Sequence, residues 1–472
     1  MTPTRTPTRR TQRRQSARAR PVRRIPPWWR DVSIAAFWGV LLFVIAIWVA
    51  GGGVQHAGSL SGALDSAGRL SGLMASALLL VQVFLMARIP WFEQAWGQDQ
   101  LARTHRVVGF TSFNLLWAHI VLITLGYAAG SRAGLWGTIV DFTVNYPGML
   151  LAIAGTAALC MVVFTSVKAA RQRLRYESWH LIHLYGYLGA GLALPHQLWT
   201  GTDFVGHLTA TVFWWTLYAV CLAAVLVFRV GLPLARMGRH RLRVLHVHQE
   251  APGVTTVTVG GRHLAALSAA GGQFFHWRFL DGPGWSRANP FSLSAAPDGR
   301  TLRFTASHAG DGSARLSTLR PGTRVLVEGP YGRMHAGVRT RRKVLLMGAG
   351  IGITPMRALL EDLPQRPGDV TIVHRVGSRD GMVLHHEIDV LARRRGAHYI
   401  VLEGHRSPHR DSWLPASVGQ VSDSDALARL CPDVAERDVY LCGAPAWMDA
   451  ARQAAREAGV PASHIHLERF TY

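Results

Sequence analysis

Residues 105–119 read HRVVGFTSFNLLWAH, and residues 179–196 read WHLIHLYGYLGAGLALPH. Each stretch is an apolar segment that carries a pair of histidines, 14 residues apart in the first and 13 apart in the second. The pairs are His105 with His119 and His183 with His196. Because an α-helix rises about 1.5 Å per residue, either gap separates two imidazoles by roughly 20 Å. In a hydrocarbon core about 30 Å thick, one histidine of each pair would then lie near each face.

Two such helices side by side would hold two stacked haems, each iron lying between one imidazole from each helix. Imidazole is a usual axial ligand of haem iron, and an ionisable side chain inside a membrane is costly enough to be a functional candidate by default. At about 100° of rotation per residue, His119 points within about 40° of the direction of His105 around the helix axis. The directions of His183 and His196 differ by roughly 140°. We expect Pro195 to kink its helix and re-aim the histidine that follows it. His180 competes with His183 as a ligand, because periodicity does not separate the two.

Six apolar runs, all in the first half of the chain, are long enough to cross a bilayer. They cover residues 34–50, 69–87, 107–128, 148–167, 181–199 and 206–229. The formal net charge is +23, and residues 1–30 contain ten arginines and no acidic residue. The connections 51–66, 129–146 and 200–205 are poor in charge by comparison. The positive-inside rule therefore places both termini in the cytoplasm, and we expect a multi-pass protein of the cytoplasmic membrane.

The first 30 residues repeat the motif Thr-Pro-Thr-Arg and contain no aromatic residue before Trp28. We interpret them as a disordered cytoplasmic tail that anchors the topology and is attracted to anionic membrane lipid. Nucleic acid, the other partner of basic tails, is not expected. The four cysteines include no Cys-x-x-Cys pair, so a disulfide framework and a cysteine-ligated iron–sulfur cluster are not supported.

The second half of the chain changes to short alternating runs separated by Gly, Pro and Asp. Six runs predict the strands of a small antiparallel β-barrel, at 241–249, 254–260, 272–279, 289–294, 301–307 and 323–328. From residue 343 onward, strands alternate with helices instead. Strands are expected at 343–347, 370–376, 397–402, 439–442 and 464–470, and helices from Thr354 and over 445–458. This alternation predicts a parallel sheet of the dinucleotide-binding type.

Four short motifs accompany these expected strands. Residues 348–355 read GAGIGITP between a strand and a helix, where glycines let backbone amides approach a pyrophosphate. The glycine spacing departs from Gly-x-Gly-x-x-Gly, so the prediction of a nucleotide-binding turn rests on its position between a strand and a helix. Residues 289–294 read NPFSLS on a strand of the barrel. Residues 310–313 read GDGS before a short helix, and residues 442–445 read CGAP after a strand.

With these motifs in this order, residues 241–472 resemble the ferredoxin–NADP reductase superfamily. Together with the histidine-bearing spans, the chain after residue 30 resembles the ferric reductase / NADPH oxidase family. The resemblance implies a membrane α-helical bundle of six spans, followed by an FAD-binding antiparallel β-barrel and an α/β nucleotide-binding domain. The implied parts are a basic tail (1–30), a haem-binding transmembrane domain (31–232), an FAD-binding domain (236–337) and an NAD(P)-binding domain (340–472).

In the family, the NPFSLS strand and the GDGS turn bind the flavin. The residues that the resemblance assigns to it are Asn289, Pro290, Phe291, Ser292, Leu293, Ser294, Gly312 and Ser313. Phe291 would lie against the isoalloxazine ring, and Ser292 would bond near its N5 edge. Asn289 stands where the family motif has a basic residue, so a contact with the flavin phosphate or ribitol loses its charge.

The glycine turn and the CGAP motif match the nicotinamide-nucleotide site of the family. The residues assigned to it are Gly348, Gly350, Gly352, Thr354, Pro355, Cys442 and Gly443. In family members the cysteine of this motif sits close to the site of hydride transfer, so Cys442 is expected to have a catalytic role with Ser292.

The end of the second parallel strand and the end of the chain complete the expected nucleotide site. Residues 374–379 read HRVGSR and offer no acidic residue to a ribose 2′-hydroxyl. Arg375 and Arg379 suit a 2′-phosphate instead, which favours NADPH over NADH. Family members keep a C-terminal aromatic residue over the flavin until nicotinamide displaces it. Phe470 is the first candidate for this role and Tyr472 the second.

The resemblance also pairs the four membrane histidines across the two helices. The inner pair, for the haem nearer the cytoplasm, is His105 with His183, and the outer pair is His119 with His196. Arg69 and Arg88 bracket the second expected span near opposite faces of the bilayer. Each is expected to bind haem propionates through charge-assisted hydrogen bonds, for which arginine is well suited.

The expected function is that of a flavocytochrome b that crosses the membrane. Cytoplasmic NADPH would reduce FAD, and single electrons would pass through two b-type haems to an extracytoplasmic small-molecule acceptor, a ferric chelate or dioxygen. Two alternatives stay open, a membrane cytochrome that donates electrons to a quinone or a protein partner, and a non-enzymatic haem redox sensor. The sequence identifies neither the acceptor nor the oligomeric state.

Overall fold

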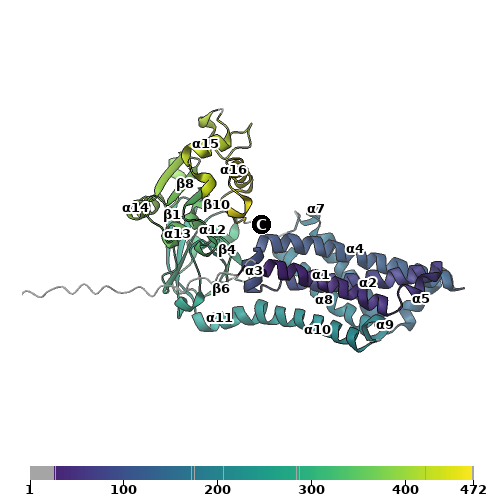
Figure 1. Cartoon of the computed structure of the whole chain (residues 1–472). Helices are drawn as coiled ribbons and strands as arrows, with labels where there is room; N and C mark the ends of the chain where they lie inside the picture. Colours follow the sequence, from purple (N-terminus) through teal and green to yellow (C-terminus); the bar gives the residue numbers. More distant parts are fainter. Residues whose placement is uncertain are drawn as a thin grey trace, which may run out of the picture. The chain divides into compact units, whose positions relative to one another are not determined.

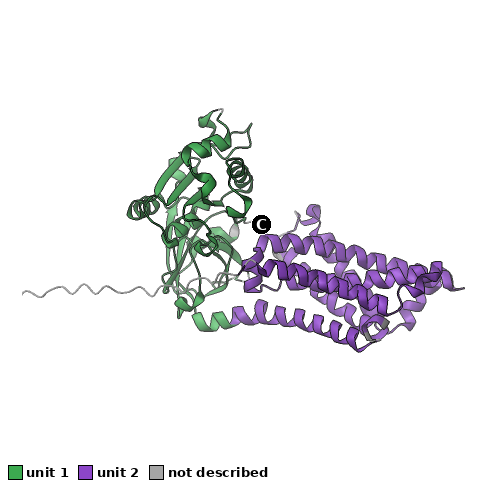
Figure 2. Cartoon of the chain, in the orientation of Figure 1, with its two compact units in different colours: residues 1–24, 235–472 green, residues 25–234 purple. Residues whose placement is uncertain are grey.

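The computed structural model describes residues 26, 28–171, 173–174, 176–205, 207–282, 284–285, 287–419 and 421–469. Most of the basic tail and the two C-terminal aromatic candidates, Phe470 and Tyr472, lie outside these residues. The chain divides into two compact units, one of residues 25–234 and one that contains residues 235–472 (Figure 2). We call them the helical unit and the sheet unit.

Within its described residues, the helical unit contains a long helix over each of the six predicted apolar runs (Figure 1). These helices are α1 (Trp28–Ala50), α2 (Leu60–Leu85), α4 (Gln98–Gly130), α6 (Met149–Ser166), α8 (Tyr176–Thr200) and α10 (Leu208–Ala224). The last continues as a π-helix (Val225–Gly231) and α11 (Leu232–His240). Shorter helices join them, namely η1 (Gln55–Gly58), α3 (Pro90–Trp96), α5 (Gly134–Asn145), α7 (Lys168–Arg171) and α9 (Thr202–Val205).

Length and composition make five helical stretches of the described chain able to cross a membrane. They are Trp28–Ala50, Leu60–Leu85, Gln98–Gly130, Met149–Ser166 and Leu208–His240. The α8 helix is not among them, so the count of six spans stays a prediction. Large apolar side chains on these helices point outward, and Leu42, Phe164 and Leu222 are each more than 60% exposed. A surface of this kind matches lipid, in which only helices and closed barrels satisfy their own backbone.

Glycines bring the long helices into close contact in two pairs. A Cβ atom at Gly68 of α2 would lie 2.8 Å from Cγ1 of Ile123 on α4. A Cβ atom at Gly155 of α6 would lie 2.8 Å from the carbonyl oxygen of Gly189 on α8. Small residues at membrane helix interfaces allow this approach. The two predicted histidine helices, α4 and α8, are therefore each fixed against a neighbour, α2 and α6.

The first part of the sheet unit consists of six antiparallel strands in two small sheets (Figure 1). One sheet has the order β1 (Arg243–Ala251), β2 (Val254–Gly260), β5 (Thr301–Ser307), and the other β4 (Asn289–Ser292), β3 (Phe274–Phe279), β6 (Val325–Tyr331). Each strand coincides with one of the six predicted runs. Single bridges, Leu293 to Phe304 and Arg243 to Arg324, link the sheets around a shared apolar core. A closed barrel stays a prediction.

The second part is a five-stranded parallel sheet, as the alternation of strands and helices predicts. Its order is β11 (Ile465–Leu467), β10 (Asp438–Cys442), β7 (Val344–Ala349), β8 (Val370–Val376), β9 (His398–Glu403). Helices α13 (Ile353–Asp362) and α14 (His385–Arg395) pack on one face, and α15 (Asp423–Leu430) and α16 (Pro445–Glu457) on the other. The chain leaves β7 toward β8 and later returns to β10 on its other side. The strand order thus reverses between β7 and β10, where doubly wound sheets bind their ligands.

Candidate functional site

The predicted glycine turn and the CGAP motif meet at the point where the strand order reverses. Gly348 at the end of β7 is paired in register with Cys442 at the end of β10. A Cβ atom at Gly352 would lie 2.2 Å from the carbonyl oxygen of Cys442. Only a glycine lets the turn approach the neighbouring strand this closely. Thr354 and Pro355 follow in the first turn of α13 and are buried.

Cys442 is buried at this position, and burial raises the pKa of its thiol to about 12. The nearby carboxylate of Glu468 raises the pKa further in the same direction. The thiol is therefore neutral at physiological pH, so it contributes shape and a weak hydrogen-bond donor rather than a nucleophile. Glu468 was not among the predicted site residues, although it lies only two residues before Phe470, in the C-terminal segment expected to cover the flavin.

Glu468 also lies close to the last strand of the antiparallel sheets. A Cβ atom at Gly332, directly after β6, would lie 2.4 Å from Oε2 of Glu468. The C-terminal segment therefore brings a carboxylate to a point where it adjoins both Cys442 and the end of β6. This places an ionisable group between the two parts of the sheet unit.

The two arginines expected to bind a 2′-phosphate lie in different surroundings. Arg375 is buried, and its guanidinium donates to the carbonyl oxygens of Val376 and Gly404, so it braces the ends of β8 and β9. Arg379 is exposed, and its Nε lies 3.0 Å from Oε2 of Glu403. Of the two, Arg379 is the one whose side chain reaches solvent at the end of β8.

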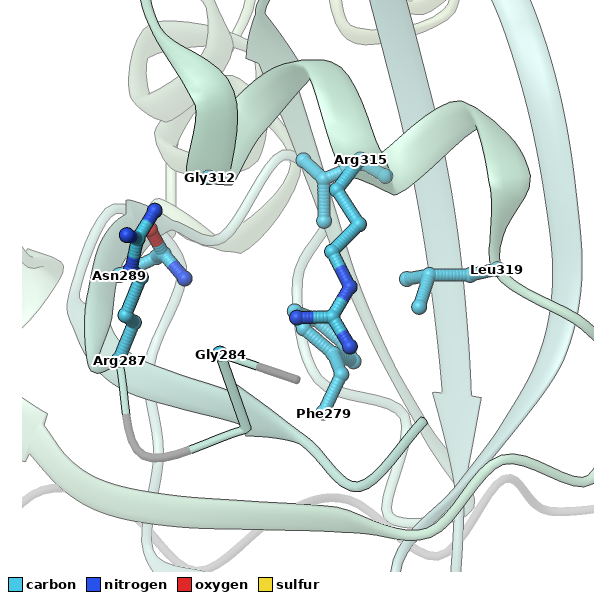
Figure 3. Close-up of a pocket in the computed structure, with 8 residues that line it drawn as sticks. Phe279, Gly284, Arg287, Asn289, Gly312, Arg315 and Leu319 are labelled. Atoms are coloured by element: carbon cyan, nitrogen blue, oxygen red, sulfur yellow. The ribbon is translucent and has the colours of Figure 1, made fainter. Parts of the chain in front are cut away.

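A cavity of about 250 Å³ lies beside the predicted flavin strand (Figure 3). Its lining consists of Phe279, Gly284, Arg287, Asn289, Gly312, Arg315, Leu316 and Leu319. Asn289 and Gly312 were predicted, and a Cβ atom at Gly312 would lie 2.5 Å from Oδ1 of Asn289. The two arginines were missed. Figure 3 shows Arg287 beside Asn289 and Arg315 across the cavity from them, so positive charge is present although the motif itself carries a neutral asparagine.

The rest of the NPFSLS motif packs into the antiparallel sheets. The ring of Phe291 stacks on Phe304 with a centroid distance of 5.0 Å and an interplanar angle of 11°, so one of its faces is covered. Ser292 and Leu293 are buried, and Pro290 belongs to the same strand.

Two predicted hydroxyl groups of the flavin site are engaged locally. Oγ1 of Thr305 donates to Oγ of Ser294 at 2.9 Å. Oγ of Ser313 accepts from the backbone N–H of Ala309 at 2.8 Å and donates to the carbonyl of Gly310 at 3.0 Å. Ser313 therefore closes the GDGS turn, and it positions Gly312 at the cavity rather than lining the cavity itself.

The structure brings the two histidines of the inner pair together. The ring centroids of His105 and His183 lie 6.0 Å apart with an interplanar angle of 62°. Two axial imidazoles on one metal ion, each nitrogen about 2.0 Å from it, place their ring centroids on the order of 6 Å apart. The separation therefore fits a haem iron between them. Trp179 has ring contacts with both candidate ligands on α8, at 5.0 Å from His183 and 6.5 Å from His180.

The outer pair lies on the same two helices, His119 on α4 and His196 on α8. The helix α8 continues through Pro195 to Thr200. Among the described residues, no group of three or more His, Cys, Asp or Glu side chains could hold a metal ion.

The two arginines expected to bind propionates both have carboxylate partners within the chain. Arg69 makes two hydrogen bonds to Asp203 of α9, from Nε at 2.9 Å and from Nη2 at 2.6 Å. Nη1 of Arg88 donates to Oε1 of Glu93, a buried residue of α3, at 3.1 Å. Paired, hydrogen-bonded charges are the form in which ionic groups are stable in an apolar region. The propionate contacts stay a prediction.

Two segments of the chain match known families. Residues 71–194 match the family described as "Ferric reductase like transmembrane component". Residues 346–453 match the family described as "Oxidoreductase NAD-binding domain". The first segment includes both histidines of the inner pair and His119, and the second includes the glycine turn and Cys442.

Individual proteins resemble parts of the chain. The stachydrine N-demethylase reductase subunit Stc4 of Rhizobium meliloti is 29% identical over 232 residues, which are 47% of this chain and 64% of that protein. Ferredoxin–NADP reductase B of Sorangium cellulosum is 29% identical over 200 residues, which are 40% of this chain and 80% of that protein. Among solved structures, the flavohaem-like FAD/NAD-binding domain of nitric oxide dioxygenase from Vibrio cholerae has 24% identity and a TM-score of 0.40, and covers 49% of this chain and 99% of that one.

The order of the family segments agrees with the order of the two units, since the first lies in the helical unit and the second in the sheet unit. The chain therefore carries, in this order, a segment similar to a ferric reductase-like transmembrane component and a segment similar to an oxidoreductase NAD-binding domain, an order that matches a fused ferric reductase-type architecture.

Proposed function

We propose that this membrane oxidoreductase carries electrons from cytoplasmic NADPH, through FAD and two b-type haems, to an extracytoplasmic acceptor such as a ferric chelate or dioxygen. The observation that carries the proposal is the separation of 6.0 Å between the rings of His105 and His183 on two different helices. Neither an isolated core histidine nor a purely soluble reductase accounts for imidazoles paired in this way inside an apolar unit.

The sheet unit would bind the dinucleotide at the point where its strand order reverses. The glycine turn would offer backbone amides to a pyrophosphate, with the start of α13 behind it. The neutral thiol of Cys442 would exclude water next to the nicotinamide without competing as a nucleophile. Arg379, which is exposed at the end of β8, is the better candidate for a 2′-phosphate, and it would exchange Glu403 for that group.

The cavity beside β4 would hold the phosphate end of FAD, because Arg287 and Arg315 line it. Guanidinium groups bind phosphate oxygens through paired, charge-assisted hydrogen bonds. Arg315 is bound to Asp281, with Nε 3.0 Å from Oδ2, so its side chain is held in one place. When bound, FAD accepts a hydride and releases single electrons, which haem iron accepts one at a time.

In the helical unit, α4 and α8 would each contribute one imidazole to each haem. With two histidines for each haem, the iron would have no position left for dioxygen, which would suit electron transfer. With both termini in the cytoplasm, as the charge distribution predicts, electrons would move outward. Moving one charge against 100 mV costs on the order of 2.3 kcal/mol.

A second candidate function is delivery of electrons to a protein partner. Its support comes from the relatives, whose names describe them as a reductase subunit of a demethylase and as a ferredoxin–NADP reductase. In this case the acceptor would be a protein redox centre rather than a small molecule outside the membrane.

The test is to supply NADPH and FAD to the purified full-length chain in detergent and follow haem reduction without oxygen. Reduction of a six-coordinate haem is the expected result, and an absence of any haem spectrum would overturn the proposal. Adding air or a ferric chelate separately then distinguishes the acceptors, since the true acceptor reoxidises the haem at the turnover rate. Slow reoxidation by both supports a protein partner.

The same assay assigns the inner ligand. His183→Ala should remove one haem from the spectrum, because its ring is the one that faces His105. The matched control is His180→Ala, on the same helix turn, which should keep both haems.

A further inference from the structure

Every one of the four paired histidines has a partner within the chain for its Nδ1 atom. On α4, Nδ1 of His105 lies 3.0 Å from the carbonyl oxygen of Gln82, and Nδ1 of His119 lies 2.8 Å from that of Gly68. On α8, Nδ1 of His183 lies 3.2 Å from Oγ of Ser166. Nδ1 of His196 lies 2.9 Å from Oγ1 of Thr200.

These contacts determine which ring nitrogen is available to a metal. A carbonyl oxygen only accepts, so both α4 histidines carry their proton on Nδ1 and present the lone pair of Nε2. Oγ1 of Thr200 donates to the carbonyl of His196 at 2.7 Å, so toward the ring it acts as an acceptor. Oγ of Ser166 accepts from Nε1 of Trp179 at 3.3 Å and has a second lone pair for His183. All four Nε2 atoms can thus be ligands.

The partners of the α4 histidines belong to the backbone of α2. Gln82 and Gly68 are 14 residues apart, the same spacing as His105 and His119. Gln82 belongs to the last turn of α2, where carbonyl groups have no partner within the helix. The orientation of the two α4 imidazoles therefore depends on how α2 packs against α4, because no side-chain substitution removes a backbone carbonyl group.

The partners of the α8 histidines are side-chain hydroxyl groups, which substitution can remove, unlike the backbone carbonyls that bind the α4 histidines. Ser166 is the last residue of α6, and Thr200 is the last residue of α8. Resting on the proposed function, we propose that Ser166 and Thr200 are positioning residues that hold the α8 imidazoles for iron and set the reduction potentials of the inner and outer haems separately. A hydrogen bond from Nδ1–H to an acceptor orients the ring and raises the basicity of the ligand.

The direction of the effect follows from the charge of the iron. A more basic imidazole stabilises ferric iron more than ferrous iron, so it lowers the reduction potential. Ser166→Ala and Thr200→Val remove the acceptor and should raise the potential of one haem each. The expected change is about tenfold in the ferric–ferrous equilibrium constant, which is about 59 mV for one electron.

The experiment is a potentiometric titration of the full-length chain in detergent, followed through the haem absorbance of each variant. The matched controls are Thr165→Val and Thr211→Val, whose hydroxyl groups donate to the carbonyls of Met161 and Phe204 and touch no paired histidine. The inference is supported if Ser166→Ala moves one potential, Thr200→Val moves the other, and the controls move neither.

Two results would overturn it, namely unchanged potentials in both variants or a shift of the same haem by both. If Thr200→Val loses haem, Thr200→Ser and Thr200→Ala are compared in the same titration. Ser keeps the acceptor, so it should retain the wild-type potential while Ala does not, and equal potentials would contradict the inference. Failure of the proposed function is a different outcome, because wild-type chain without haem gives no titration at all.

Discussion

At the scale of single residues, the positive charge at the proposed flavin cavity does not lie on the residue at which the family motif has a basic side chain. The motif residue that is basic in the family is Asn289 here, whereas Arg287 lies two residues earlier and lines the same cavity. Proteins place arginine where phosphate must be bound in a fixed geometry. Arg287 therefore supplies positive charge to this cavity although Asn289 is neutral.

We expect Arg287→Gln to weaken FAD binding by about 10- to 100-fold, because a hydrogen bond to a charged group contributes about 1.5–3 kcal/mol. The measurement is flavin fluorescence on titration of the deflavinated sheet unit. The control is Arg320→Gln, an exposed arginine outside the cavity lining, which should bind FAD as the wild type does. Equal affinities for both variants would show that Arg287 does not contact the flavin.

The buried His335 makes the sheet unit sensitive to acid. Burial lowers the pKa of this side chain from 6.5 to about 4, and its Nδ1 accepts from the backbone N–H of Gly337 at 3.1 Å. The unfolded chain binds the proton more readily, so the stabilisation is complete above pH 6.5 and falls as the pH drops toward 4. The slope from this one group is up to about 1.4 kcal/mol per pH unit.

His335→Asn keeps an acceptor for the Gly337 N–H and removes the titrating group. We therefore expect the free energy of unfolding to depend less steeply on pH in this variant between pH 6.5 and 4. Urea unfolding of residues 235–472 at a series of pH values measures the two slopes. Identical slopes would mean that His335 is not protonated on unfolding in this range. Part of the slope should remain, because burial also lowers the pKa of His374 to about 4.

At the scale of elements, the pairing of α2 with α4 depends on a glycine beside the outer histidine. A Cβ atom at Gly72 would lie 2.5 Å from Nδ1 of His119, which is too close for either group to stay in place. The two helices meet along this line, and Gly68 on the same helix supplies the carbonyl that orients the ring. A change at Gly72 would thus act on helix packing and ligand geometry together.

We expect Gly72→Ala to displace His119 and remove the outer haem from the spectrum, with a loss of about 1–3 kcal/mol of stability typical of overpacking. The haem content per chain and the thermal unfolding midpoint in detergent are the measurements. Gly39→Ala in α1 is the control, since a Cβ atom there meets nothing within 4 Å. A normal haem content in Gly72→Ala would contradict the placement of His119.

At the scale of the whole molecule, the described residues of the proposed nucleotide and flavin sites all belong to one unit. The glycine turn, Cys442 and the entire cavity lining come from residues 235–472. The paired histidines come from residues 25–234. Reduction of flavin by NADPH should therefore be separable from electron transfer through the membrane.

We expect the sheet unit alone to transfer electrons from NADPH to a soluble dye at the rate of the full chain. In the full chain, His119→Ala should abolish reduction of the outer haem while the rate of dye reduction is unchanged, because no group of the soluble site has been altered. Stopped-flow absorbance measures both rates. Loss of dye reduction in His119→Ala would show that the two units are functionally coupled.

The sequence alone determined the elements and their order. All six antiparallel strands and the five parallel ones lie where period and turn residues predict them, because these signals are local. The spacing of the histidines could be interpreted for the same reason, because helix geometry converts a number of residues into a distance along the helix. Family motifs in a fixed order identified the architecture that the comparisons support.

Only the tertiary structure decided which candidates share a site and which are engaged elsewhere. Arg375 is buried and donates to the carbonyl oxygen of Gly404, and Arg69 is paired with Asp203. Arg287, Arg315 and Glu468 lie beside residues that are distant in the sequence. The tertiary structure also placed the ring of His183 6.0 Å from that of His105. The physical reason is that charge pairing and ligand geometry depend on distances between segments remote in sequence, which no local period encodes.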